Sequence, residues 1–110
     1  MSQARGAAAL RHLFQHRTAV NLPDGMGGVA RTWLTVDRLW GAIEAVSDGP
    51  ALAEERPIAM LAHRVTVRAP NTLAPGDRLV LGARVFEVQS VTDPDGRGRL
   101  SRCRCLEEQT

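Results

Sequence analysis

Residues 77–91 have the sequence DRLVLGARVFEVQSV, in which two segments of alternating apolar and polar side chains flank Gly82-Ala83. Such alternation is typical of β-strands with one buried face. A two-residue turn with glycine at its first position suits a type II′ hairpin, and it fixes the register by placing Arg78 opposite Glu87. The predicted core face of this hairpin carries four apolar side chains: Leu79, Leu81, Phe86 and Val88.

The same period of two recurs along most of the chain. It predicts further strands over residues 14–22, 29–46, 58–68 and 100–106. The second of these is either one long strand with a bend or two strands. Clusters of turn residues separate the strands, namely Pro23–Gly28, Ala69–Asp77 with a type II turn at Pro75-Gly76, and Asp93–Gly96. We therefore expect a mainly β fold, a small antiparallel β-barrel or sandwich of five to seven strands.

Two segments depart from this strand pattern. Residues 51–56 favour a short helix that a proline ends. Residues 1–13 form either a short N-terminal helix or a frayed tail. A chain of 110 residues is long enough for one domain. We place that domain at residues 14–106, with an insertion at 47–57 and a frayed tail at 107–110.

Composition indicates a globular protein and excludes few functions. Apolar residues make up 44% of the chain, and no run approaches the roughly 18 apolar residues of a membrane span. The N-terminal segment lacks the pattern of a secretory signal, so the default compartment is the cytoplasm. All 14 basic residues are Arg, which indicates either a GC-rich genome or selection for bidentate contacts with carboxylate or phosphate. A net charge of +2 does not by itself predict strong binding to nucleic acid.

No group of side chains has the pattern of a catalytic, metal or cofactor site. His12 and His16 have a spacing that suits helical metal ligands, but they lack a third ligand. His63 lies on the apolar face of its predicted strand, where a core histidine is expected. The glycine-rich GMGGVA segment lacks the Lys and Ser/Thr of a phosphate loop. Cys103 and Cys105 share one strand face and are expected to be buried, reduced thiols. We predict that the protein is not an enzyme and uses no cofactor.

An Arg-rich patch near the C-terminus is the best candidate for contact with a partner: Arg97, Arg99, Arg102 and Arg104. The patch is either a solvated strand face and loop, or an interface with an acidic protein or with DNA phosphate. The DNA interpretation gives an alternative function, that of a small nucleic-acid-binding β-barrel. Exposed aromatic platforms for single strands are not expected, because the alternation favours burial of all four aromatic side chains: Phe14, Trp33, Trp40 and Phe86.

Residues 24–46, DGMGGVARTWLTVDRLWGAIEAV, contain an Asp and paired-Gly turn, two Trp seven apart, then a small residue and Ile-Glu. This pattern resembles the phage head–tail joining family, the head-closure or stopper proteins of long-tailed phages and gene transfer agents. The likeness continues through HRVTVR at 63–68 and the hairpin, and covers about residues 10 to 106. A proline at 57 departs from it, because this segment is often more helical in similar proteins. The matching residues are Asp24, Gly27, Gly28, Trp33, Trp40, Ala42, Ile43 and Glu44.

The resemblance implies a homo-oligomeric ring of small β-barrels, placed between a portal-side adaptor protein and a tail terminator or other tail protein. Such a ring closes the head, lets packaged double-stranded DNA pass through its channel, and offers a platform for tail attachment. The chain would reside at the head–tail junction of a virion or virion-like particle that is assembled in the host bacterial cytoplasm. A ring needs a heterologous interface, in which two different patches on each subunit meet. We expect the Arg-rich patch to contribute to subunit or partner contacts.

A stopper must obstruct its channel and later open. A barrel wall cannot do both, because opening it would break a ladder of backbone hydrogen bonds. We therefore predict that the insertion at residues 47–57 forms the channel gate, with acidic Asp48, Glu54 and Glu55 repelling DNA phosphate. The glycine turn at residues 23–28 is the second candidate for the gate.

Overall fold

A computed structural model describes residues 10–46 and 60–108 of the chain. Within these residues the regular structure consists of strands, and each strand coincides with a segment of apolar-polar alternation. The strands are β1 (His12–Pro23), β2 (Val29–Ala45), β3 (Met60–Arg68), β4 (Arg78–Leu81), β5 (Arg84–Thr92) and β6 (Leu100–Glu108).

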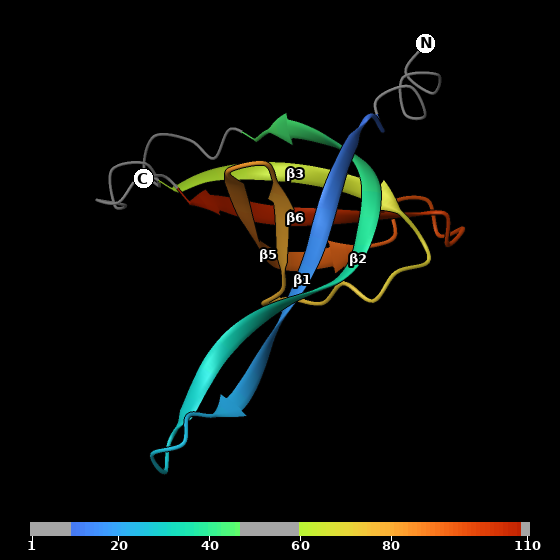
Figure 1. Ribbon diagram of the computed structural model, residues 1–110. Coiled ribbons are helices and arrows are strands. Elements are labelled where there is room, and N and C mark those ends of the chain that lie inside the picture. The colour runs from blue at the N-terminus through green and yellow to red at the C-terminus, as the bar shows by residue number, and fades with distance from the viewer. Residues whose placement is uncertain (1–9, 47–59, 109–110) are drawn as a thin grey trace.

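The six strands close into a barrel in the order β1-β2-β3-β6-β5-β4, with β4 pairing back onto β1 (Figure 1). All of the pairings are antiparallel. The mainly β prediction is confirmed, and of the two predicted architectures the strands form the barrel. Closure leaves the wall without an unpaired edge. The closing contact is short, since only Gln15, His16 and Arg17 of β1 pair with β4.

The β4–β5 hairpin has the register predicted from its sequence. Arg78 lies opposite Glu87, and Leu79 lies opposite Phe86. Gly82 has a φ of 62°, as the first central position of a type II′ turn requires. Although Arg78 is opposite Glu87 in the register, its guanidinium pairs with Glu108, with Nη2 3.7 Å from Oε2. The hairpin is therefore barrel wall whose outer face is linked to β6.

A compact apolar core fills the barrel. Phe14 and Phe86 are fully buried and meet edge to face, with ring centroids 6.1 Å apart. Ile43, Leu73, Leu81 and Val91 pack around the core with partial burial. The buried cluster comprises Phe14, Leu39, Val65, Val67, Leu79, Phe86, Val88, Cys103 and Cys105.

The predicted burial of the two tryptophans is wrong for Trp40 and only partly right for Trp33. The side chain of Trp40 is 48% exposed, because it lies on the outer face of β2, whereas Leu39 beside it points into the core. Trp33 is half-buried between two guanidinium groups, those of Arg31 and Arg78, which lie 5.0 and 4.1 Å from its ring centroid. Alternation identified the strand correctly but not the face that the core covers.

Two strand boundaries differ from the sequence prediction, one open choice between one strand and two is resolved, and one predicted element lies outside the described residues. β1 begins at His12, so the predicted N-terminal segment is shorter than 13 residues. Glu107 and Glu108 were predicted to start a frayed tail, but they are the last residues of β6 because both pair with β3. Residues 29–45 form one strand rather than two. The predicted helix at 51–56 lies outside the described residues.

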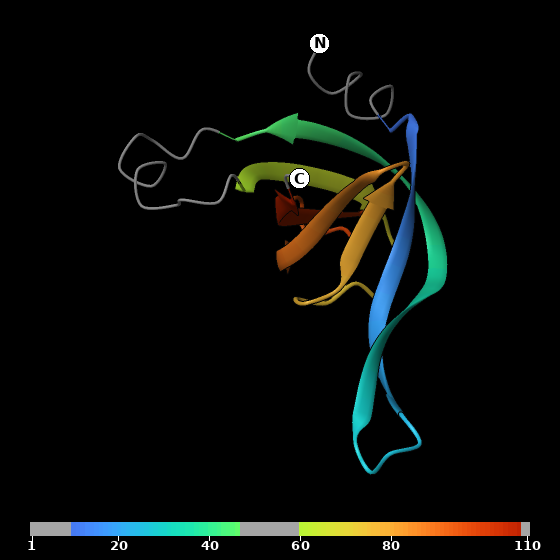
Figure 2. The ribbon, with the colours of Figure 1, turned by 60° about the vertical axis from the view of Figure 1, so that its left-hand side comes forward.

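The β1–β2 hairpin extends far beyond the barrel wall as a two-stranded ribbon (Figures 1 and 2). β1 contacts β4 only up to Arg17, and β2 contacts β3 only from Gly41 onward. A register shift between His16 and Arg17 marks the point where the ribbon leaves the wall. We call residues 18–35 the arm. Its strands pair with each other, and the predicted glycine turn lies at its tip, where Gly25 and Gly27 have positive φ.

Candidate interaction surfaces

The outer face of β6 carries two of the four predicted patch residues. Arg102 and Arg104 are exposed and alternate with the buried Cys103 and Cys105, as predicted. Burial raises the pKa of the Cys103 thiol to about 12, and it raises the pKa of the Cys105 thiol still further. These thiols are therefore apolar core groups at neutral pH. The polar groups of β6 that a partner could contact are the arginines on its outer face.

A shallow polar pocket lies on this face, across β3, β5 and β6. Arg64 of β3 is directly opposite Arg104, while Ser90 and Thr92 of β5 are opposite Arg104 and Arg102. These five side chains are among those that line the pocket, whose volume is about 200 Å³. Like charges opposite each other on neighbouring strands repel. Glu44, 3.1 Å from Arg64, offsets part of this charge, and an anionic group bound in the pocket would accept hydrogen bonds from guanidinium and hydroxyl groups.

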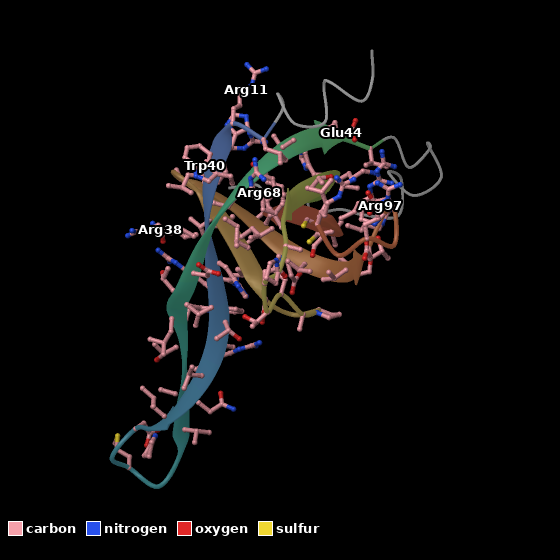
Figure 3. The ribbon with its side chains drawn as sticks, turned by 90° about the vertical axis from the view of Figure 1, so that its right-hand side faces the viewer. Arg11, Arg38, Trp40, Glu44, Arg68 and Arg97 are labelled. Carbon is pink, nitrogen blue, oxygen red and sulfur yellow. The ribbon has the colours of Figure 1, made fainter. Side chains whose placement is uncertain are left out.

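The other two patch residues, Arg97 and Arg99, lie in the loop between β5 and β6, and Figure 3 places Arg97 at that end of the barrel. Asp93 accepts backbone N–H bonds from Gly96 and Gly98, which shapes the loop. Asp95 accepts hydrogen bonds from the backbone of Arg97 and, at 3.2 Å, from the side chain of Arg99. The same two contacts, the backbone bond first, lower the pKa of Asp95. The four predicted residues thus divide into a strand pair and a loop pair.

A partly buried charge network that the sequence did not reveal links β3, β5 and β6. Arg84 donates two hydrogen bonds to Glu107, at 2.7 and 2.9 Å. Nε2 of His63 lies 3.4 Å from the same carboxylate. The hydrogen bonds from Arg84 lower the pKa of Glu107, and the positive charge of that guanidinium adds to the effect. His63 is a core histidine, as predicted, and Glu107 fixes the end of β6.

A second hidden network fixes the base of the arm. Nε2 of His16 lies 2.8 Å from Oδ2 of Asp77, and both side chains are buried. Thr18 donates to Oδ1 of Asp77 at 2.9 Å, and the backbone N–H of Ala74 donates to Oδ2. Asp77 and His16 are 61 residues apart, so no local pattern could connect them. The network ties the arm to the loop before β4.

Three residues of the motif at positions 24–46 have structural roles that their contacts explain. Asp24 accepts N–H bonds from Met26 and Gly28 through one oxygen, at 2.8 and 3.0 Å, and these bonds lower its pKa. Ile43 packs against the core. Glu44 accepts a hydrogen bond from Arg64 at 3.1 Å.

The predicted gate residues Asp48, Glu54 and Glu55 lie outside the described residues, so the gate stays a prediction. Within residues 10–46 and 60–108, no three His, Cys, Asp or Glu side chains gather in a way that could hold a metal ion. The described part of the chain also contains no helix long and apolar enough to cross a membrane.

The arm presents apolar side chains to solvent along its length. Successive cross-strand pairs place Leu22 with Ala30, Val20 with Thr32 and Leu34 with Thr18 on one face. Leu22 and Leu34 are 47% and 48% exposed. Exposed leucines on an uncharged ribbon face outside the barrel indicate a surface for macromolecular contact. A closed barrel with such an arm and an Arg-rich face is typical of a structural protein that binds other macromolecules.

Comparison with known proteins agrees with this description. The family model of the phage head completion protein matches residues 6–108, and the chain belongs to this family. A chain in the virion of a native gene transfer agent particle is 25% identical, with a TM-score of 0.66 over 90% of this chain and 94% of that one. Protein SF1141 from Shigella flexneri 2a has the same fold in solution, with 21% identity, a TM-score of 0.67, and coverage of 90% and 93%. No curated protein matches the chain.

Family membership defines the role of this chain in broad terms. It is a structural head-completion protein of a virion or virion-like particle, and it associates there with other head and tail components. The resemblance found in residues 24–46 is confirmed.

Proposed function

We propose that this chain forms a closed ring at the head–tail junction, between a portal-side adaptor and the tail, where it retains packaged DNA and receives the tail. The observation that best supports this proposal is the architecture itself. A closed barrel is a rigid body, and it carries a projecting arm whose apolar face is uncovered. Rigid bodies that join through such extensions suit a repeating assembly around an axis.

The predicted gate belongs to this proposal. Residues 47–57 connect the end of β2 to the start of β3, at the opposite end of β2 from the arm tip. The described residues on either side of the predicted gate, at the end of β2 and the start of β3, are therefore remote from the arm tip. The glycine turn at 23–28, the second candidate for the gate, forms the arm tip.

Deleting the gene in the producing cell tests the proposed function. We expect heads that lose their DNA and separate tails to accumulate, and we expect purified chain added early to that lysate to restore joined particles. Filled heads that stay intact after deletion would remove DNA retention from the proposal. Complete, tailed particles without the chain would contradict the proposal as a whole.

The alternative function is binding of nucleic acid through the Arg-rich face. It is favoured by the pocket in which Arg64 and Arg104 lie opposite each other, with Arg102 nearby. This hypothesis predicts that isolated protein binds duplex DNA with an affinity that falls steeply with salt, by about one power of salt concentration for each phosphate contact. Absence of such binding would favour the ring component.

A further inference from the structure

The arm carries an apolar face that its own barrel does not cover. Register places the side chains of Val20, Leu22, Ala30, Thr32 and Leu34 on this face, and none of them is charged. We call it the arm face. A two-stranded ribbon in water is only marginally stable by itself. An uncharged face with two half-exposed leucines would be stabilised by a covering surface in the assembled particle.

The opposite face of the same hairpin, at the barrel end, carries a second exposed apolar patch. Leu13 and Trp40 are cross-strand partners there, with 41% and 48% of their side chains exposed. Arg11 and Arg38 lie on either side of Trp40 (Figure 3), and both are exposed. We call these four residues the Trp40 patch. It combines an apolar centre with a positively charged rim.

The two surfaces complement each other in charge as well as in apolar character. Asp24 lies at the arm tip, next to the arm face, and both of its turn hydrogen bonds are accepted by one carboxylate oxygen. No ion pair joins Asp24 to a guanidinium in the described part of the chain. The Trp40 patch offers two guanidinium groups, those of Arg11 and Arg38. An arm seated on that patch would place a carboxylate against cations and leucines against an indole.

One molecule cannot bring its own two surfaces together. Leu13 and Leu22 are nine positions apart on β1, which corresponds to roughly 30 Å of extended strand. The surfaces also lie on opposite faces of the ribbon. Contact between them therefore requires a second molecule.

We propose that the arm face docks on the Trp40 patch of a neighbouring copy of this chain, and that this contact is the head-to-tail interface of the ring. The inference rests on the proposed function and names the surfaces it would use. Arm-to-arm pairing is the competing arrangement. It would create a two-fold dimer and leave Trp40 exposed, whereas the head-to-tail contact covers both patches and repeats around an axis.

Cysteine cross-linking distinguishes these arrangements. The substitutions Met26→Cys at the arm tip and Val36→Cys, two residues from Arg38 at the edge of the Trp40 patch, introduce exposed thiols, while Cys103 and Cys105 are buried. The double variant, treated with a short bis-maleimide in concentrated solution and within purified particles, should give a ladder of dimers, trimers and larger species. Each single variant alone should give no ladder, and a mixture of the two should give dimers only.

A surface variant provides an independent check. Leu22→Ser with Leu34→Ser should weaken head-to-tail cross-linking by about tenfold to a hundredfold, because two half-exposed leucines lose their buried contact. Val29→Ser is the matched control, since Val29 is 69% exposed and pairs with Pro23 on the opposite ribbon face. It should leave the ladder unchanged. Thermal unfolding of each variant confirms that the barrel is intact.

Three outcomes would overturn the inference. Met26→Cys alone should form no dimers under the proposal, so efficient dimers from it would indicate arm-to-arm pairing. Cross-links from the arm to a different particle protein, without a ladder, would indicate another partner. Particles that contain the double variant and yield no cross-linked ladder would also refute the contact. A chain missing from the particles altogether would instead contradict the proposed function.

Discussion

Replacing Phe86 with alanine tests the barrel core directly. The side chain is fully buried, and its ring meets those of Phe14 and His63 edge to face, with centroids 6.1 and 5.4 Å away. Deleting a buried phenylalanine costs about 3–5 kcal/mol, and the lost edge-to-face contacts keep this site away from the lower end of that range. We therefore expect a loss of about 4 kcal/mol, a large share of the roughly 5–15 kcal/mol that stabilises a typical domain.

Urea denaturation followed by far-UV circular dichroism measures this loss. With an m-value of about 2 kcal/mol/M, a loss of about 4 kcal/mol lowers the midpoint by about 2 M. Trp40→Ala is the matched control, because the side chain of Trp40 is larger than that of Phe86 but half exposed. It should lower the midpoint by less than about 0.5 M. Equal shifts for the two variants, or a larger one for Trp40, would refute the assignment of inner and outer faces.

Three further predictions concern the barrel wall and its charges. Gly41→Ala should cost about 1–3 kcal/mol in the same urea experiment, because its Cβ would lie 2.6 Å from a backbone oxygen of β3; an unchanged midpoint would mean that β2 can move away. Cys103 and Cys105 should resist alkylation at pH 8 until urea unfolds the chain, because burial raises both thiol pKa values, and rapid native labelling would contradict this. Because the pKa of Glu107 is lowered in the folded protein, its carboxylate contributes stability at pH values above 4.5, its ordinary pKa. This contribution is lost as pH falls through the folded-state pKa. Glu107→Gln should therefore flatten this acid limb of the curve of stability against pH.

Local patterns in the sequence were sufficient for the strands and for the hairpin. The alternation around Gly82-Ala83 and the positive φ available to glycine determine the register of β4 and β5 without any distant contact. The alternation of Cys103 and Cys105 with arginines likewise identified the inner and outer faces of β6. In these cases the information lies within a few residues.

Features that depend on distant segments could not be predicted in this way. A strand pattern does not say which part of a ribbon other strands will cover, so the exposure of Trp40 and the free length of the arm were missed. The buried pair of His16 and Asp77 and the bidentate contact of Arg84 with Glu107 join residues 61 and 23 positions apart. Such pairs become visible only when the barrel closes.

The division of the Arg-rich patch has the same origin. Adjacent arginines in the sequence suggested one surface, but the loop carboxylate of Asp95 holds Arg99 while Arg102 and Arg104 remain on the strand face. Arg64 joined that face only because β3 pairs with β6. A surface built from several strands is defined by topology, which a single strand pattern does not contain.

Cryo-electron microscopy of the head–tail junction, in particles from the cell that encodes this chain, tests the central claim most directly. The account predicts a closed ring of six-stranded barrels around the DNA channel, with each arm lying on the Trp40 patch of the next copy. A junction that lacks these barrels, or that holds a single copy beside the axis, would contradict it.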